Sequence, residues 1–440
     1  MYIKNSLIQK IKGRKATIGV IGLGYVGLPL VIRFAEEGFT VLGFDVDDDK
    51  VRKLNAGESY IKHIPDEKIQ RIVSSQRFSA TSDFTKISEP DCILICVPTP
   101  LDEKMAPDMR FVEATAYEIA LHLRQGQLVI LESTTYPGTT REVLLPKFEN
   151  SSLKIGADYF LAFSPEREDP GNLKFTTKNI PKVVGGITDA CTEVTAQLYD
   201  QIVDKVVPVS STEVAEFTKL LENIFRAVNI ALVNEMKVLA TKMGVDIWEI
   251  IEASSTKPFG FMPFYPGPGL GGHCIPIDPF YLAWKAKEYG FNTHFIELAG
   301  EVNTSMPQYV MDRLADVFNS KGKCLNGSKV LVLGVAYKKD TDDIRESPGL
   351  EVMDLLRKKG TEVLYNDPYI HKIPDMRKYD FTMDSTELTE ELLQSLDAVL
   401  IATSHSSYDY EWIVANSDLV LDTRNATQKV RNNRERIIKA

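Results

Sequence analysis

Short apolar runs alternate with longer amphipathic stretches over the first half of the chain. The apolar runs lie at 17–21, 40–44, 92–97, 128–131, 159–163, 182–184 and 205–209. Runs that are apolar throughout, with helical stretches between them, are typical of strands buried on both faces of a parallel sheet. We therefore expect an α/β lobe here.

One long helical segment follows, from 213 to 243. Ser210 and Glu213 have the spacing of a capping box, and Gly244 is a suitable C-terminal stop. At about 1.5 Å per residue the helix would exceed roughly 40 Å, more than one compact domain needs. We expect it to link two lobes and to bury a face against a second copy of the chain, in a homodimer or higher homo-oligomer.

The α/β pattern returns in the last third of the chain. The proline- and glycine-rich stretch 258–279 is too aromatic for a polar linker, so we expect an ordered loop. Strands are predicted at 329–333, 362–365, 398–402 and 419–421, with a helix at 349–359. The predicted fold class is α/β, with two parallel-sheet lobes joined by a long central helix and a helical middle domain.

Charge and cysteine content narrow the possible functions. The 440 residues include 51 Lys+Arg and 61 Asp+Glu, a net charge of −10, which argues against nucleic acid as a partner. No apolar stretch approaches the roughly 20 residues that span a bilayer, and residues 1–15 do not resemble a secretory signal. We expect no membrane association, a cytoplasmic location, reduced thiols and no metal, since the five cysteines and six histidines are scattered.

A dinucleotide-binding fingerprint opens the first lobe. Gly22, Gly24 and Gly27 have GxGxxG spacing between the first predicted strand and a helix, and Asp45 follows the second strand. The glycines permit a tight turn and close approach of a pyrophosphate, and a carboxylate there accepts hydrogen bonds from ribose hydroxyls. Because it would repel a 2′-phosphate, Asp45 predicts NAD over NADP. The alternative is a glycine-rich turn followed by an exposed aspartate.

Cys274 differs from the other cysteines because it follows a glycine-rich turn and has Asp278 four residues on. Cys92 and Cys96 lie in a strand pattern, where a buried and inert thiol is the usual outcome. Cys274 is a candidate nucleophile, although glycine-rich loops are also plain turns.

Two further pairs of polar residues are candidates for catalysis. Lys219 and Asn223 project from one face of the long helix and could stabilise an oxyanion, but spacing alone favours a solvated helix face. Glu166 and Arg167 follow a predicted strand at the sheet end where ligands bind, and they could equally form a surface ion pair.

Together these residues resemble a known family over almost the whole chain. The sequence is similar to the nucleotide-sugar 6-dehydrogenases, which comprise UDP-glucose, UDP-N-acetylhexosamine and GDP-mannose dehydrogenases. The matching segments, in order, are IGLGYVGLP (21–29), CVPTP (96–100), ESTTYPGTT (132–140), SPER (164–167), EFTKLLEN (216–223), GPGLGGHCIPIDP (267–279), GVAYKKDTDDIRESP (334–348) and DTRN (422–425).

The resemblance implies a four-electron oxidation with two equivalents of NAD. Cys274 would capture an aldehyde as a thiohemiacetal, which is oxidised to a thioester and hydrolysed to the acid. Lys219 and Asn223 would hold the oxyanion, Asp278 would assist proton transfer, and Glu166 and Thr134 would position water and the reacting hydroxyl. The cofactor residues would be Gly22, Gly24, Tyr25, Val26, Gly27, Asp45, Pro98 and Thr99.

The resemblance also assigns the second lobe to the UDP portion of the substrate. The turn after the strand at 329–333 lacks the second and third glycines of the fingerprint, and lysines and an aromatic residue suit a nucleoside diphosphate. Arg345 could be a structural ion-pair residue. The substrate-binding residues would be Glu166, Arg167, Lys219, Asn223, Gly271, Tyr337, Lys338 and Arg424.

The sugar is indicated by the segment after Glu166. UDP-glucose enzymes of this family typically carry a second glutamate four residues on, where this chain has Pro170. The chain resembles the branch acting on 2-acetamido sugars, so we expect UDP-N-acetylglucosamine, with UDP-N-acetylmannosamine and UDP-glucose as alternatives. A nucleotide-sugar binding protein without turnover and a two-electron hydroxyacid dehydrogenase are the other readings.

Three domains are expected. Residues 1–209 would form a Rossmann-like NAD-binding domain, 210–320 a central helical domain with the cysteine loop and dimer contacts, and 321–440 a Rossmann-like UDP-sugar-binding domain.

Overall fold

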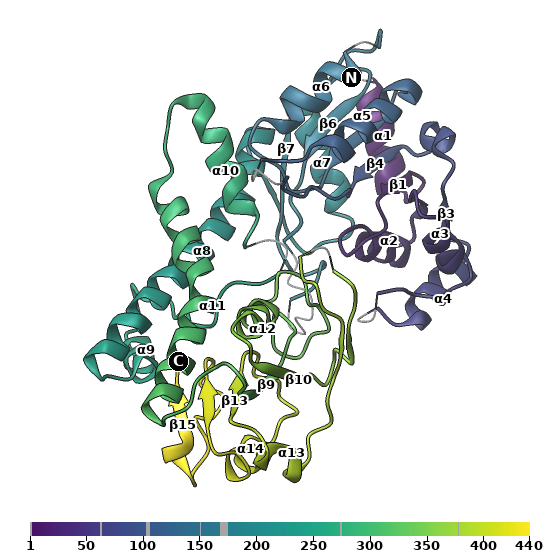
Figure 1. Cartoon of the computed structure of the whole chain (residues 1–440). Coiled ribbons are helices and arrows are strands. Elements are labelled where there is room, and N and C mark those ends of the chain that lie inside the picture. Colours follow the sequence, from purple (N-terminus) through teal and green to yellow (C-terminus); the bar gives the residue numbers. More distant parts are fainter. Residues whose placement is uncertain are drawn as a thin grey trace. The chain divides into compact units, whose positions relative to one another are not determined.

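The computed structural model describes residues 2–61, 64–102, 106–149, 151–167, 175–272, 275–376 and 378–440. The chain forms two compact units, Met1–Glu222 with Phe280–Phe291, and Asn223–Pro279 with Asn292–Ala440. Their boundary falls within the long helix α8 (Thr212–Met243), labelled in Figure 1. The division into three domains stays a prediction.

The first unit is built on one eight-stranded sheet of order β3-β2-β1-β4-β5-β6-β7-β8. The strands are β1 (Thr17–Ile21), β2 (Thr40–Phe44), β3 (Phe78–Thr81), β4 (Cys92–Ile95), β5 (Leu128–Leu131), β6 (Phe160–Phe163), β7 (Lys182–Gly186) and β8 (Val206–Pro208). The sheet is parallel as predicted up to β6, but β7 runs antiparallel to β6. The described part of the connection contains no helix, and a chain that returns without a crossover helix pairs antiparallel.

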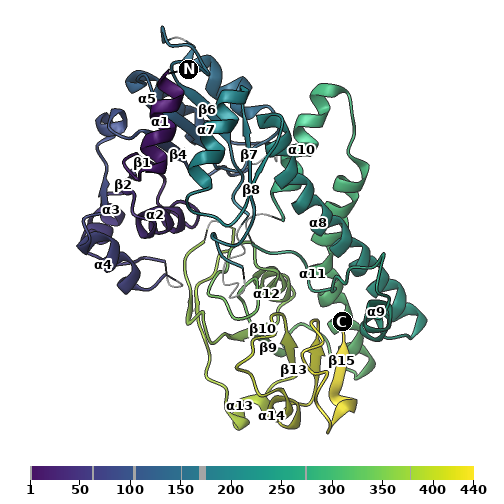
Figure 2. The ribbon, with the colours of Figure 1, turned by 180° about the vertical axis from the view of Figure 1, so that it is seen from behind.

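Helices cover both faces of this sheet. On β4, Cys92 and Leu94 pack with α1 (Tyr2–Lys12), α2 (Gly27–Glu36) and α7 (Asp189–Tyr199), of which α1 and α7 lie in front in Figure 2. Ile93 and Ile95 pack on the other face with α5 (Arg110–His122) and α6 (Leu145–Phe148). The alternation confirms strands buried on both sides. Two helices precede β3, namely α3 (Asp48–Asn55) and α4 (Asp66–Ser74).

The second unit contains a parallel five-stranded sheet of order β10-β9-β13-β14-β15. Its strands are β9 (Lys329–Leu333), β10 (Glu362–Asn366), β13 (Ala398–Ile401), β14 (Val420–Asp422) and β15 (Ile437–Lys439). One face packs on α11 (His294–Ser320) and α12 (Pro348–Lys358), and the other on α13 (Glu390–Gln394) and α14 (Tyr410–Ala415). A short hairpin pairs β11 (Lys372–Ile373) with β12 (Met383–Asp384).

Both ends of α8 are set by local chemistry. The amide of Val214 donates to the Ser211 hydroxyl at 3.3 Å, so Ser211 and not Ser210 caps the helix. Gly244 has φ +71, and the amide of Val245 reaches the carbonyl of Ala240 at 3.0 Å, which confirms the predicted stop. The helix α9 (Ile247–Ser255) then packs back on α8. No helix in the described ranges is both long and apolar enough to span a bilayer.

Candidate active site

The first βα turn has the shape that a dinucleotide pyrophosphate requires. Gly22 has φ +91, and a Cβ there would lie 2.5 Å from the carbonyl oxygen of Cys96. A Cβ on Gly27 would lie 2.0 Å from the carbonyl oxygen of Gly22. A Cβ on Gly24 would meet no protein atom within 4 Å, so the space beside it is open. The turn leads into the N-terminus of α2, whose amides favour an anion.

The remaining cofactor residues surround this turn. The Asp45 carboxylate is 7% exposed and accepts the amides of Leu23 and Asp47, each at 3.0 Å. Asp45 is therefore not the exposed aspartate of the alternative reading, and its remaining lone pairs suit ribose hydroxyls. Tyr25 is exposed, and Val26 stands at the N-cap of α2 without a side-chain cap. The residues present thus fit NAD.

Pro98 and Thr99 follow β4 on a segment that is held from two sides. The hydroxyl of Ser133 donates to the carbonyl of Val97 at 2.8 Å, and Thr99 is buried. The hydroxyl of Tyr281, from helix α10 (Asp278–Ala286), donates to the carbonyl of Thr99. Tyr281 was missed by the sequence reasoning, because nothing in its neighbourhood signals a partner so distant in the chain.

Thr134 and Lys219 meet in the first unit. Lys219 is 8% exposed on α8, and its ammonium donates to the Thr134 hydroxyl just after β5. The solvated-face reading of Lys219 is therefore wrong. One turn earlier, the buried Glu216 carboxylate accepts the amide of Gly138 at 2.6 Å. Burial raises the pKa of Glu216 to about 7, partly offset by its hydrogen bonds. The neighbouring Thr135 hydroxyl is buried and has no partner among the described residues.

Asn223 and Asp278 meet in the second unit. Both are at most 3% exposed, and the Asn223 amide nitrogen donates to the Asp278 carboxylate at the start of α10. Arg226 donates to the Asn223 side-chain oxygen. Arg226 thereby fixes which end of the amide faces Asp278, and one N–H of the amide remains for another acceptor. Sequence reasoning missed Arg226, although it lies one turn from Asn223.

Glu166 and Arg167 follow β6 but have different partners. The Arg167 guanidinium binds both carboxylate oxygens of Glu222, at 2.6 and 3.2 Å. Glu166 accepts the amide of Arg167 at 2.6 Å and faces the ammonium of Lys182 at 3.6 Å. The ion pair considered between the Glu166 and Arg167 side chains is therefore replaced by two separate pairs. Neither Lys182 nor Glu222 was found from the sequence.

Three predicted substrate residues gather around the glycine loop 267–272. A Cβ on Gly271 would lie 2.6 Å from the Cβ of Tyr337, and one on Gly267 would lie 2.3 Å from the Arg424 guanidinium. Burial lowers the pKa of Arg424 to about 10, which leaves it cationic at neutral pH. Lys338 follows Tyr337 and is half-buried. His273 and Cys274 lie outside the described residues, so the role of Cys274 stays a prediction.

Two other cationic side chains of the second unit, Arg345 and Lys237, differ in their partners. Arg345 binds the carboxylate of Asp343 at 2.6 Å, as the ion-pair reading anticipated. Lys237 of α8 is 2% exposed, and its ammonium has no hydrogen-bond partner in the described part of the chain. Burial first and then the charge of Arg424 lower the pKa of Lys237 to about 7.

The second sheet also carries a carboxylate at the position that Asp45 has in the first sheet. In the second sheet, protein groups already donate hydrogen bonds to this carboxylate. Asp367 follows β10 as Asp45 follows β2, and accepts the amides of Val335 and Ala336 at 2.7 and 3.0 Å. The imidazole of His405 is fully buried against the same carboxylate, with Nε2 at 3.0 Å. Its Nδ1 accepts the amide of Asp340, so Nε2 carries the proton and donates.

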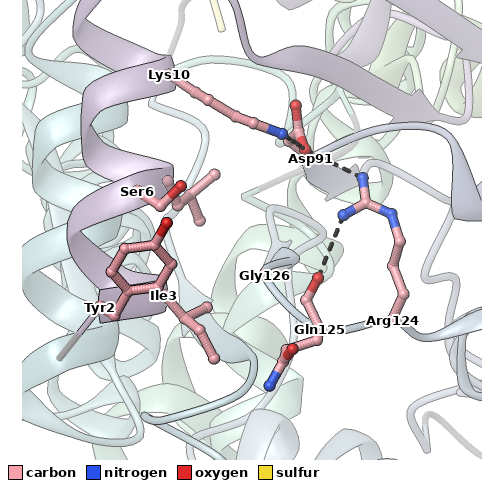
Figure 3. Close-up of a pocket in the computed structure, with 9 residues that line it drawn as sticks. Tyr2, Ile3, Ser6, Lys10, Asp91, Arg124, Gln125 and Gly126 are labelled. Atoms are coloured by element: carbon pink, nitrogen blue, oxygen red, sulfur yellow. Dashed lines mark hydrogen bonds and ion pairs between the residues drawn. The ribbon is translucent and has the colours of Figure 1, made fainter.

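A pocket of about 180 Å³ lies at the end of the first sheet opposite to the Gly22 turn (Figure 3). It is bordered by α1 and by the segments preceding β4 and β5. Asp91 pairs there with Lys10 at 2.9 Å and with Arg124 at 3.1 Å. The figure shows these charges turned toward one another, so they pair among themselves in the wall of the pocket. Among the described residues, no cluster of three His, Cys, Asp or Glu is arranged to hold a metal ion.

The fold and the first βα turn define a protein of the dinucleotide-binding class with a second parallel sheet. The chain matches the family models for the NAD binding domain (16–203), the central domain (213–305) and the UDP binding domain (331–429) of the UDP-glucose/GDP-mannose dehydrogenase family. It belongs to this family and is an NAD-dependent UDP-sugar dehydrogenase.

Relatives and a solved structure agree with this assignment. The chain is 33% identical to the UDP-N-acetyl-D-mannosamine dehydrogenase of Pyrococcus horikoshii, over 89% of this chain and 90% of that one. It is 32% identical to the UDP-N-acetyl-D-glucosamine 6-dehydrogenase of Pseudomonas aeruginosa, over 89% and 91%. A solved structure of the UDP-D-ManNAc dehydrogenase from Pyrococcus horikoshii superposes with a TM-score of 0.85 at 31% identity, over 96% of this chain and 98% of that one.

Proposed function

We propose that the chain oxidises the 6-hydroxymethyl group of a UDP-N-acetylhexosamine, UDP-N-acetylglucosamine in particular, to the uronic acid. The product would serve as a precursor for surface polysaccharide. The observation that carries the proposal is the buried Asn223–Asp278 contact, with Lys219 one turn earlier on the same helix. Buried polar groups held in fixed orientations suit charge stabilisation in a transition state.

The reaction balances as a four-electron oxidation. One alcohol and one water become one carboxylate, with loss of two hydrides and release of three protons. NAD supplies the hydride acceptor when bound. The intermediate aldehyde cannot lose a second hydride until a nucleophile makes its carbon tetrahedral. We assign this addition to the Cys274 thiolate, which leaves as thiol when water hydrolyses the thioester.

The remaining roles follow from hydrogen-bonding capacity. The Lys219 ammonium has three donors, of which one is used by Thr134, so others remain for a developing oxyanion. Asn223 keeps one N–H for the same oxygen, and Asp278 would take or return the proton of the thiol or alcohol. Glu166 would position the hydrolytic water.

The Cys274→Ser variant tests this mechanism. A serine alkoxide is harder to form and a poorer leaving group, so we expect no uronic acid and an ester intermediate detectable as added mass on the chain. Normal acid formation, with two NADH per sugar, would contradict the thiol mechanism. Wild-type release of only one NADH would favour the two-electron hydroxyacid dehydrogenase.

The sugar is proposed from the sequence and the relatives. Pro170 stands where UDP-glucose enzymes typically carry a glutamate, and it lies outside the described residues. According to its name, the Pyrococcus horikoshii relative acts on UDP-N-acetylmannosamine, and the Pseudomonas aeruginosa relative acts on UDP-N-acetylglucosamine. The two relatives are almost equally similar to this chain. Initial rates of NADH formation with UDP-N-acetylglucosamine, UDP-N-acetylmannosamine and UDP-glucose decide the matter. A preference for UDP-glucose would overturn the proposal.

We also propose that α8 forms the contact of a homodimer or higher homo-oligomer. A stripe of large apolar side chains runs along the helix, each between 42% and 67% exposed: Val214, Phe217, Leu221, Phe225, Leu232, Leu239 and Met243. A stripe with this spacing is typical of a packed helix face. Leu232→Glu should reduce the mass measured by sedimentation equilibrium, and an unchanged mass would exclude this face.

A further inference from the structure

Lys182 is a buried lysine that joins the two strand ends bearing Thr134 and Glu166. It begins β7, has a side chain 6% exposed, and its ammonium lies 2.6 Å from Glu132, 3.2 Å from the carbonyl of Pro165 and 3.6 Å from Glu166. We propose that Lys182, anchored by Glu132, is a positioning residue that holds the Glu166 carboxylate in the place from which it would position the hydrolytic water. This rests on the function proposed above for Glu166.

Glu132 is placed so that it stabilises a buried cation in the core. Glu132 is 1% exposed, and its second oxygen accepts the hydroxyl of the buried Tyr199. Burial disfavours the ammonium of Lys182, but the charges of Glu132 and Glu166 outweigh this and keep its pKa above the ordinary value. Lys182 therefore remains charged at neutral pH. Its three N–H groups have three acceptors around them.

The position of Glu166 depends on this cation in two ways. Its own strand end is held through the Pro165 carbonyl, and its carboxylate is held by the charge at 3.6 Å. The adjacent guanidinium of Arg167 is engaged by Glu222, so it does not take over this task. Contacts inside the sheet thus hold both the Glu166 carboxylate and the strand end that bears it.

Loss of the cation has a definite electrostatic sign. The titratable groups facing Lys182 are Glu132 directly after β5, Tyr199 at the end of α7, Glu166 in the segment after β6 and Cys96 directly after β4. Without the ammonium, Glu132 and Glu166 lose the cation that both of them face. Like charges and the missing partner both favour a protonated acid at this pair of carboxylates, since the charge of Lys182 opposes the burial that raises the pKa of Glu132. The acidic limb of activity should therefore move to higher pH.

The test is a Lys182→Met variant of the full chain. We expect kcat to fall at least tenfold at neutral pH, the acidic limb of the kcat profile to move up by about one pH unit or more, and KM for the UDP-sugar to change less than threefold. The matched control is Lys285→Met, because Lys285 is likewise buried between two carboxylates, Glu142 and Glu288, each at 2.7 Å. The control should lower thermal stability and leave the pH profile in place.

A second comparison separates positioning from mere folding. If Lys182 acts through Glu166, Lys182→Met should reduce kcat no further in a Glu166→Gln background, whereas a purely structural role predicts the same fractional loss in both. Should Lys182→Met fail to fold, the charge-neutral pair Glu132→Gln with Lys182→Met supplies the same test, with a smaller upward shift of the acidic limb. An unshifted limb in the folded variant overturns the inference. A wild type that forms no uronic acid overturns the proposed function instead.

Discussion

Gly24→Ala separates the cofactor's contribution from that of the fold. A Cβ at Gly24 would meet no protein atom within 4 Å, and Gly24 is not among the residues with positive φ. Alanine at a compatible position stabilises a protein by about 0.4–1 kcal/mol through the unfolded state. The melting temperature should therefore be unchanged or slightly higher, and any loss of NAD binding comes from the ligand side.

The expected loss of NAD affinity is large. A methyl group at Gly24 would occupy the space through which the pyrophosphate reaches the amides at the start of α2. Hydrogen bonds to charged groups contribute about 1.5–3 kcal/mol each, so losing one or two of them costs on the order of 3 kcal/mol. At roughly 1.4 kcal/mol per factor of ten, Kd for NAD should rise about a hundredfold.

Calorimetry or cofactor fluorescence measures this affinity without turnover. Gly27→Ala is the contrasting variant, since its Cβ would lie 2.0 Å from the Gly22 carbonyl oxygen and must disturb the turn itself. It should lower the melting temperature as well as NAD binding. If Gly24→Ala folds normally and binds NAD within threefold of the wild type, the turn does not hold the pyrophosphate and the reasoning fails.

Two further changes have predictable results. Asp45→Asn removes the charge beside the ribose site while retaining one acceptor, so KM for NAD should rise about tenfold and the preference over NADP should shrink by a similar factor, as measured with both cofactors. A preference that stays intact would assign the discrimination to another group. Lys237 has a pKa lowered from 10.5 to about 7, so wild-type stability should rise as the pH increases from about 7 to about 10. Lys237→Met should be more stable at pH 7 by up to about 4 kcal/mol and lack this slope in urea unfolding, and an equal slope in both proteins would contradict the burial argument.

Local patterns were sufficient for the strands of the core. β1, β2, β5 and β9 occupy the predicted ranges because each is a continuous apolar run between turns. β3 (Phe78–Thr81) was missed because its alternating polar residues, at the edge of the sheet, resemble a loop. The reversed direction of β7 depends on the connection before it, which an apolar run does not encode.

The residues of the candidate site also differ in whether a local sequence pattern reveals them. Gly22, Gly27 and Asp45 could be proposed as cofactor residues from the sequence because the fingerprint lies in their spacing. The partners Lys182 and Tyr281 were not, because each acts on a residue 50 or more positions away, Glu132 and Thr99 respectively. A lysine that opens an apolar strand carries no local sign of the carboxylates that the sheet brings to it.

The internal engagement of Asp367 sets the second sheet apart from the first as a place for a dinucleotide. Four backbone amides, from Val335, Ala336, Tyr369 and Ile370, and the His405 ring fill the acceptor capacity of that carboxylate. An adenosine analogue that inhibits by capturing such a carboxylate should therefore bind at the predicted site of Asp45 and not at Asp367. A titration with such an inhibitor should saturate at one equivalent per chain, and two equivalents per chain would contradict this expectation.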